Sequence, residues 1–453
     1  MGENEVPPII VWFRRDLRLA DNPALMAAVT SGRPVIPLYI LDETPGVRRI
    51  GAASRWWLDK SLAAIAGSLG VLGSRLILRR GAAAEVLEQL IAETGAAGAY
   101  WNRLYDPGVV ERDMALKTTL NAEARSFNAA LLTEPWEVQT GAGKDYSVFT
   151  PYWRAARSRL DRVEALPAPK RLTAPTEWPK SDTLADWKLH PSKPDWSGGF
   201  DIWRPGETGA LERLAQFLDK GVHGYAERRD RPDLDGVSRL SPHLHFGEIG
   251  ARQIWIAAET AVATGEAAYV DVDKFQAELG WREFNHHVVF HHPRIATENL
   301  RASFDAMPWR KDVKAFRAWT EGRTGYPLVD AGMRELWATG YMHNRVRMVA
   351  ASFLVKHLLI DWREGERWFW DTLVDADPAN NAANWQWVAG CGADASPWFR
   401  IFNPIGQAEK FDPDGAYVHR WVPELGTRRY PRPIVDHAAA RARALDAVKT
   451  GRL

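Results

Sequence analysis

The chain has 453 residues, of which 46% are hydrophobic and 25% charged, and this composition excludes disordered and fibrous proteins. The length exceeds that of one ordinary hydrophobic core, so we expect two domains. The formal net charge is +1, so any DNA site must be a local basic patch on an otherwise balanced surface. The one cysteine, Cys391, excludes an internal disulfide and any zinc or iron–sulfur site that needs several cysteines.

The sequence shows no sign of export or membrane insertion. Residues Met1–Glu5 are acidic and lack the basic and apolar pattern of a signal peptide. No apolar run reaches the length of a membrane span. We therefore expect a cytoplasmic protein without membrane contact, and we expect it to be a monomer.

Short apolar runs alternate with helical segments over residues 1–135. Their nearly continuous apolar character is typical of parallel strands that are buried on both faces. Asn22-Pro23 fits a helix N-cap followed by proline at the first helical position. The alternation predicts a doubly wound, parallel-sheet α/β domain. The expected strands are Ile9–Phe13, Val35–Leu41, Leu76–Leu78, Gly98–Trp101 and Ala130–Leu132, and the expected helices include Ser54–Leu69 and Ala82–Thr94.

The pattern changes in the middle of the chain. Seven prolines between Leu166 and Pro205 interrupt a polar stretch, which we interpret as an ordered interdomain connection. After Gly206 the sequence is helical almost throughout and shows no alternation of strands. We therefore predict a connector over 136–205 and an all-α domain over 206–453.

Three segments of the helical domain mix polar and aromatic side chains. Each alone could be a solvated face with an incidental aromatic residue. Carboxamides recognise heterocycle edges, arginine binds phosphates or carboxylates, and tryptophan stacks on flat rings. Together the segments favour an aromatic-lined polar pocket for a large heterocyclic ligand. Helical spacing groups Glu278, Trp281, Arg282 and Asn285 in one segment and Asn344, Arg347, Met348 and Ala351 in another, and the third segment is 375–387.

Four histidines cluster near the end of one predicted helix: His286, His287, His291 and His292. His287 and His291 have the i,i+4 spacing of a metal-binding pair. No acidic residue is placed as an obvious third ligand, so we favour packing or hydrogen-bonding histidines and predict no metal. The sequence also lacks a P-loop, a nucleotide-binding Gly-x-Gly-x-x-Gly and a nucleophile motif.

Eight motifs, in the same order, cover nearly the whole chain. They are Val11–Arg18 with Asp21–Leu25, Gly236–Pro242, Glu278–Phe284, Gly322–Pro327, Met342–Met348, Asp361–Glu366, Asp375–Trp387 and Arg400–Pro404. On these motifs the chain resembles the DNA photolyase and cryptochrome family. The run Val329–Gly340 is similar to plant cryptochromes as well as to bacterial photolyases, which suggests the bacterial class closest to plant cryptochromes.

The resemblance implies that the helical domain binds a folded FAD, which is used reduced and light-excited. Tyr225 and the Val237–Ser241 loop would hold the phosphates and the ribityl chain. The family often has threonine where Val237 stands, so only its backbone N–H can serve here. Asp377 would bind the pyrimidine edge of the flavin, and Asn381 would face flavin N5, where plant cryptochromes have aspartate. The implied FAD contacts are Tyr225, Val237, Ser238, Arg239, Leu240, Ser241, Arg282, Asn344, Arg347, Asp375, Ala376, Asp377 and Asn381.

The resemblance also implies a repair site for cyclobutane pyrimidine dimers in DNA. Glu278 would stabilise the lesion anion made by electron transfer, while Trp281 and Trp387 would pack against the flipped lesion; photolyases are a standard example of base flipping. The other implied DNA contacts are Arg229, Asn344, Arg345, Met348, Arg400 and Gln407. Most of the 22 tryptophans would ordinarily fill the core, but Trp385, Trp362 and Trp309 match the family's electron-relay chain.

Three other functions fit the family or the pocket less well. A cryptochrome that signals through a protein partner is disfavoured by Asn381, Glu278, Met348 and Trp387, and the chain ends at Leu453 without a long tail. Enzymes that repair (6-4) photoproducts usually have histidine where Asn344 stands. A light-independent reductase would need a nicotinamide fingerprint, and the sequence contains none.

For the antenna chromophore we favour methenyltetrahydrofolate over deazaflavin, although Asn102–Val109 looks somewhat deazaflavin-like, and we assign no residues to it.

Overall fold

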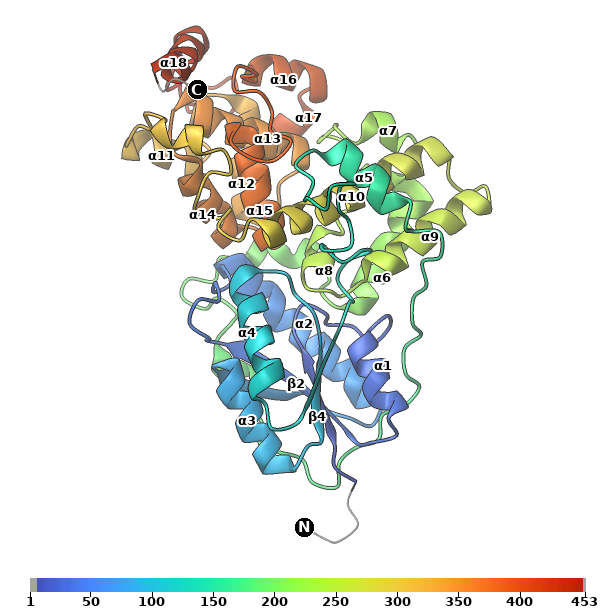
Figure 1. Cartoon of the computed structure of the whole chain (residues 1–453). Helices are drawn as coiled ribbons and strands as arrows, with labels where there is room; N and C mark the ends of the chain where they lie inside the picture. The colour runs from blue at the N-terminus through green and yellow to red at the C-terminus, as the bar shows by residue number, and fades with distance from the viewer. Residues whose placement is uncertain (1–5, 451–453) are drawn as a thin grey trace.

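The computed structural model describes residues 6–450 and contains a five-stranded parallel sheet below a helical domain (Figure 1). The strands are β1 (Ile9–Phe13), β2 (Val35–Asp42), β3 (Ile77–Gly81), β4 (Gly98–Asn102) and β5 (Glu123–Phe127), in the order β3-β2-β1-β4-β5. The order reverses between β1 and β4, which is the topology of a doubly wound sheet. The α/β prediction for the first domain is thus confirmed.

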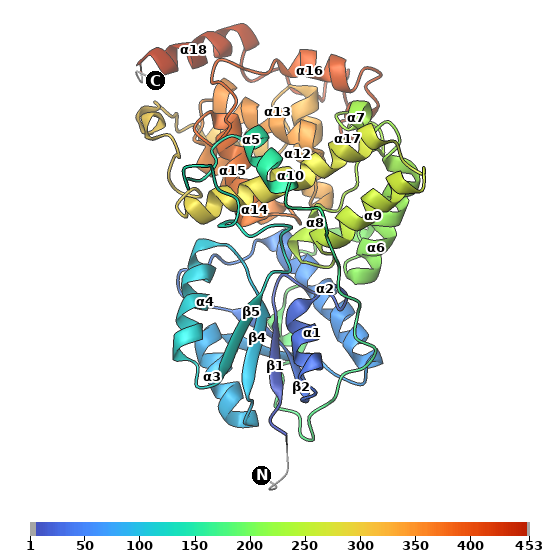
Figure 2. The same ribbon diagram turned by 45° about the vertical axis from the view of Figure 1, so that its right-hand side comes forward.

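Helices cover both faces of this sheet (Figure 2). The central strand alternates its side chains between the faces: Ile9, Val11 and Phe13 join one core cluster, and Ile10 and Trp12 join another. The first cluster includes residues of α1 (Pro23–Thr30) and α2 (Ala52–Val71), and the second includes residues of α3 (Ala83–Thr94) and α4 (Pro107–Thr119). Burial on both faces explains the continuous apolar runs of the sequence.

One predicted strand is wrong. Ala130–Leu132 is not part of the sheet, and the fifth strand is the polar edge strand Glu123–Phe127. Leu131 is buried, and the backbone N–H of Leu132 donates to Glu283 of the helical domain at 2.8 Å. The apolar run therefore serves the contact between the domains. An edge strand has one exposed side, so its polar composition hid it from a search for apolar runs.

The predicted connector packs on both domains. Its first helix is α5 (Phe149–Arg157), which lies against α10 (Tyr269–His291) of the helical domain. The proline-rich part then runs along the α/β domain, where backbone hydrogen bonds join Val35 to Thr173 and Asp182 to Leu78, both at 2.8 Å. These contacts order the segment although it forms little regular secondary structure.

The second domain is helical throughout the part that the structure describes, as predicted. No helix within residues 6–450 is both long enough and apolar enough to cross a bilayer. The long α10 crosses the domain and packs on α15 as well as on α5, α7 and α9 (Figure 2). The other α-helices of this domain are α6 (Glu207–Gln216), α7 (Tyr225–Arg228), α8 (Ser241–His245), α9 (Ala251–Ala263), α11 (Val313–Thr320), α12 (Pro327–Thr339), α13 (Asn344–Ser352), α14 (Trp362–Thr372), α15 (Pro378–Ala389), α16 (Pro404–Phe411), α17 (Ala416–Trp421) and α18 (His437–Thr450).

Candidate cofactor and substrate site

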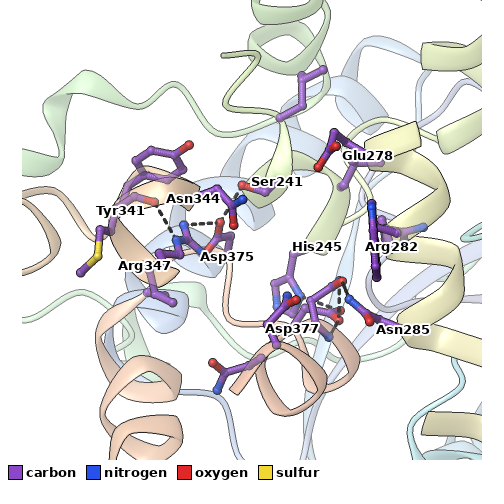
Figure 3. A pocket seen from close by; sticks show the side chains of 18 of the residues that line it. Ser241, His245, Glu278, Arg282, Asn285, Tyr341, Asn344, Arg347, Asp375 and Asp377 are labelled. Atoms are coloured by element: carbon purple, nitrogen blue, oxygen red, sulfur yellow. Dashed lines mark hydrogen bonds and ion pairs between the residues drawn. The ribbon is translucent and has the colours of Figure 1, made fainter. Parts of the chain in front are cut away.

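A cavity of about 450 Å³ lies between α8 and α10 on one side and α13 and α15 on the other (Figure 3). This volume lies within the range of small-molecule sites. All three polar-aromatic segments of the sequence meet in its wall. The predicted residues that line it are Tyr225, Arg229, Ser238, Leu240, Ser241, Glu278, Trp281, Arg282, Asn344, Arg345, Arg347, Met348, Asp375, Ala376, Asp377, Asn381, Trp385 and Trp387.

Helix α10 supplies one wall of the cavity. Its predicted stripe of Glu278, Trp281, Arg282 and Asn285 faces the cavity, as the helical spacing indicated. Trp281 stacks on Phe149 of α5, with ring centroids 3.8 Å apart and planes inclined by 8°. One face of the indole is therefore covered, and its position in the wall is held by the connector.

The opposite wall contains an ion pair whose carboxylate is buried. Arg347 of α13 donates two hydrogen bonds to the Asp375 carboxylate, at 3.1 and 2.8 Å, and Ser241 of α8 donates a third at 2.6 Å (Figure 3). The Arg347 Nε–H also donates to the backbone carbonyl of Met342 at 2.6 Å. A planar guanidinium held in this way presents a fixed, positively charged edge beside the cavity.

Asp377 lies at the floor of the cavity, where it starts helix α15. Its Oδ1 accepts from the backbone N–H groups of Ala379 and Asn380, the geometry of an N-cap. Its Oδ2 is turned toward His245, at 3.5 Å, and Arg15, at 3.7 Å. Burial disfavours the charge, but His286, His245 and Arg15 outweigh it and hold the pKa of Asp377 well below its usual range. The floor thus carries an ionised carboxylate.

Asn381, one turn further along α15, has a defined amide orientation. Its Nδ2 donates to the backbone carbonyl of Glu366 at 3.0 Å and to Glu366 Oε1 at 2.8 Å. Both of its amide protons are therefore taken by acceptors outside the cavity. The carbonyl oxygen of Asn381 is the group left to interact with a ligand.

Acidic and basic groups alternate along the rim of the cavity. Glu278 forms an ion pair with Arg229 of the α7 region. Arg229 lies next to Asp230, whose carboxylate accepts from Arg345 of α13 at 2.6 Å. Of the arginines predicted to contact DNA, Arg229 is thus held by Glu278 and Arg345 by Asp230, which the sequence analysis did not single out.

Six of the predicted residues do not line the cavity. Val237 packs in the core beside it, and the guanidinium of Arg239 lies 5.9 Å from the Tyr341 ring. Arg400 is exposed, and its backbone carbonyl accepts from the buried Lys356 at 2.8 Å. Gln407 is partly buried on α16. Trp362 and Trp309 belong to the core behind the cavity.

The three tryptophans assigned to an electron relay lie along one path of packed segments. The ring of Trp385 lies so close to Gly365 of α14 that a Cβ there would meet it at 2.1 Å. Trp362 is one turn before Gly365 on α14, hence on the same side of this helix. Near Trp309, the backbone N–H of Arg310 donates to Leu359 at 2.7 Å, just before α14. Trp385 and Trp362 are buried and Trp309 is partly exposed, so the series runs toward the surface.

The histidine cluster at the end of α10 makes hydrogen bonds with the connector. His287 accepts from the backbone N–H of Tyr146 and donates to the carbonyl of Pro135, both at 3.0 Å. His292 pairs with Asp145 at 2.9 Å. These contacts, with that of His291 to Pro135, give three of the histidines a structural role in joining α10 to residues 135–146, whereas His286 faces Asp377 at 3.7 Å.

The sequence analysis missed several residues around the cavity. His245 lies three positions after the Gly236–Pro242 motif, and Asn380 and Asn384 lie inside the third segment, so proximity could have indicated them. Nothing in the sequence pointed to Glu366 as a partner of Asn381, or to Arg48, which binds Glu366 from the α/β domain. These two contacts join residues that are far apart in the chain.

Family models, related sequences and solved structures all relate this chain to the same group of proteins. Residues 9–170 match the family model described as DNA photolyase, and residues 275–429 match the FAD binding domain of DNA photolyase. The chain is 53% identical to a deoxyribodipyrimidine photo-lyase of Agrobacterium fabrum over 97% of both chains. It is 40% identical to cryptochrome-1 of Arabidopsis thaliana over 94% of this chain and 64% of that protein. A bacterial class III photolyase structure from Agrobacterium tumefaciens superposes with a TM-score of 0.96, at 52% identity, over 100% of this chain and 99% of that one.

Proposed function

Because this chain belongs to the DNA photolyase family, we propose that it repairs cyclobutane pyrimidine dimers in DNA by light-driven electron transfer from reduced FAD. It is a flavoprotein and an enzyme of the deoxyribodipyrimidine photo-lyase type. The observation that carries the proposal is the joining of three polar-aromatic segments into one cavity whose walls combine an arginine–aspartate pair, carboxamides and tryptophans.

The residues around the cavity fit FAD chemically. Arg239 has a φ of 51°, in the left-handed region, and is followed by Leu240 in a helical conformation. Such a pair turns successive backbone N–H groups toward one side, where they can bind phosphate oxygens. On the flavin side, the ionised Asp377 would accept from the N3–H of the pyrimidine ring, and Arg347 with Asp375 would lie beside the isoalloxazine. Bound FAD would supply the electron that the chain itself cannot provide.

The chain's own residues would bind and orient the lesion. Trp281 and Trp387 offer flat faces for the flipped bases, with Trp281 held in place by Phe149. Glu278 lies on the same wall, one helical turn from Trp281, and would hydrogen-bond a pyrimidine carbonyl edge through a proton or water. Arg229, Arg345, Arg400 and Gln407 would contact the DNA backbone around the opening.

Three finer assignments complete the proposal. We propose methenyltetrahydrofolate as antenna, because the chain resembles the bacterial photolyase class closest to plant cryptochromes, whose members tend to use this folate. We also propose that the enzyme acts as a cytoplasmic monomer, and that residues 1–135, 136–205 and 206–453 are its antenna-binding domain, connector and catalytic domain.

The proposed activity can be tested directly with purified protein. We expect denaturation to release FAD together with a second, folate chromophore, and we expect dimer-containing oligonucleotide to be repaired in blue light but not in the dark. Chromatography of the released chromophores and a repair assay in both conditions provide the measurement. Release without any flavin would refute the proposal, and flavin without light-dependent repair would favour a cryptochrome-type receptor.

The electron relay makes a separate prediction. Trp309→Phe should slow photoreduction of the oxidised flavin, because phenylalanine is much harder to oxidise than indole at the surface end of the path. Repair by chemically reduced enzyme should be unchanged, since that electron passes from flavin to lesion. Absorption during illumination measures the first and dimer splitting the second, with Trp178→Phe in the connector as control. Photoreduction at the wild-type rate would remove Trp309 from the relay.

A further inference from the structure

A surface arginine of the α/β domain reaches a buried carboxylate beside the cavity of the helical domain. Arg48, in the loop between β2 and α2, donates from both terminal nitrogens to the two oxygens of Glu366 on α14, at 2.6 and 2.9 Å. The Glu366 side chain is 3% exposed and that of Arg48 is 34% exposed. Within residues 6–450, Arg48 is the one basic side chain that forms an ion pair with Glu366. A buried carboxylate depends strongly on such a partner.

The loop that carries Arg48 is fixed against α14. The guanidinium lies over the ring of Trp370, 3.8 Å from its centroid, and the Trp370 Nε1–H donates to the backbone carbonyl of Arg49 at 2.9 Å. A Cβ at Gly51 would meet the Trp370 carbonyl oxygen at 2.1 Å, so the backbones approach as closely as glycine permits. The Ala52 N–H donates to Asp371 at 2.9 Å. Arg48 is thus held in place by its own contact with Trp370 and by the contacts that residues 49–52 make with α14.

Glu366 in turn fixes the orientation of the Asn381 amide. An ionised carboxylate can only accept hydrogen bonds, so its contact with Asn381 at 2.8 Å must come from the amide nitrogen. The second amide proton goes to the Glu366 backbone carbonyl, at 3.0 Å. Charge on Glu366 also polarises the amide, which makes the carbonyl oxygen of Asn381 a better acceptor.

We propose that Arg48 is a positioning residue of the flavin site, which holds Glu366 on the Asn381 amide so that Asn381 presents its carbonyl oxygen to flavin N5. This inference rests on the proposed function, because it needs a bound flavin. Reduced FAD carries a proton on N5 and oxidised FAD a lone pair, so a fixed acceptor favours the reduced form. Without Arg48, the buried carboxylate loses its ion-pair partner and its fixed orientation, and its bond to Asn381 weakens.

The midpoint potential of the bound flavin tests this role independently of repair. We expect Arg48→Met to raise the oxidised-to-reduced ratio at a fixed potential about tenfold, the effect of one net hydrogen bond. For a two-electron couple this corresponds to a midpoint potential lower by about 30 mV. Arg48→Lys keeps the charge and one hydrogen bond, so it should recover at least half, but not all, of the shift. Arg49→Met, which removes the same charge from the neighbouring exposed residue, should leave the potential unchanged.

Dye-equilibrated titration of the four proteins gives all the outcomes. An unchanged potential in Arg48→Met would overturn the inference while leaving the proposed function intact. An equal shift in Arg49→Met would also overturn it, because the effect would then be one of total charge. If Arg48→Met does not fold, Arg48→Lys decides. We then expect its midpoint potential to be lower than that of wild type, and an unchanged potential would contradict the role. Wild-type protein without flavin would refute the proposed function and this inference together.

Discussion

Arg347→Met should abolish retention of FAD, which we expect to be the largest effect of any single change in the site. Asp375, whose side chain is 3% exposed, would lose both hydrogen bonds from the guanidinium and keep only the one from Ser241. Breaking a buried ion pair from one side costs roughly 3–5 kcal/mol, because the remaining charge is left without a partner. A flavin bound beside this pair would meet an uncompensated carboxylate. The flavin-to-protein ratio after gel filtration measures the loss.

Loss of FAD must be separated from loss of the fold. The double variant Arg347→Met/Asp375→Leu removes both charges, so we expect thermal unfolding to return toward that of the wild-type apoprotein while FAD remains absent. Arg367→Met breaks an exposed pair with Glu364 on α14 and should retain FAD, since exposed pairs contribute little. If Arg347→Met kept stoichiometric FAD, the pair would be a structural element and not part of the cofactor site.

Glu278→Ala should reduce the yield of dimer splitting much more than it reduces binding of damaged DNA. A hydrogen bond aimed at the lesion anion is stronger after electron transfer than before, so its loss acts mainly on the chemical step. The structure adds that Glu278 is paired with Arg229. Removing the carboxylate frees this arginine for a DNA phosphate, which should keep binding at or above the wild-type level.

One experiment separates the two effects. Filter binding at two salt concentrations gives the affinity, and a single flash on the bound complex gives the yield per lesion. Glu227→Ala is the matched control, since it removes an exposed carboxylate from the short helix α7, which packs against α10, and should change neither quantity. Lost binding with an unchanged yield per bound lesion would make Glu278 a recognition residue.

Much of the site could be predicted from the sequence because it is built from local patterns. On α10, helical periodicity alone places Glu278, Trp281, Arg282 and Asn285 on one face, and the structure turns that face to the cavity. The same holds for Asn344 and Arg347 on α13. Burial of the parallel sheet on both faces similarly made four of the five strands visible as apolar runs.

The fifth strand was missed because an apolar run indicates that a segment is buried, but not whether it is buried in a sheet or between two domains. Ala130–Leu132 is apolar because it joins the two domains, whereas Glu123–Phe127 is polar because it forms the edge of the sheet. Which surface an apolar run covers depends on packing between segments that are distant in the chain, and local propensity contains no information on this.

The sequence by itself determined the fold class, the family and the residue types around the cofactor, since each depends on local periodicity or on motifs that can be compared directly. Only the tertiary structure decided how the groups act. The direction of the Asn381 amide depends on Glu366, and Glu366 depends on Arg48, which lies 318 positions away in the other domain. The pairing of Glu278 with Arg229 likewise joins separate helices. Hydrogen bonds and ion pairs act over a few ångströms of space, so their partners exist only after the chain has folded.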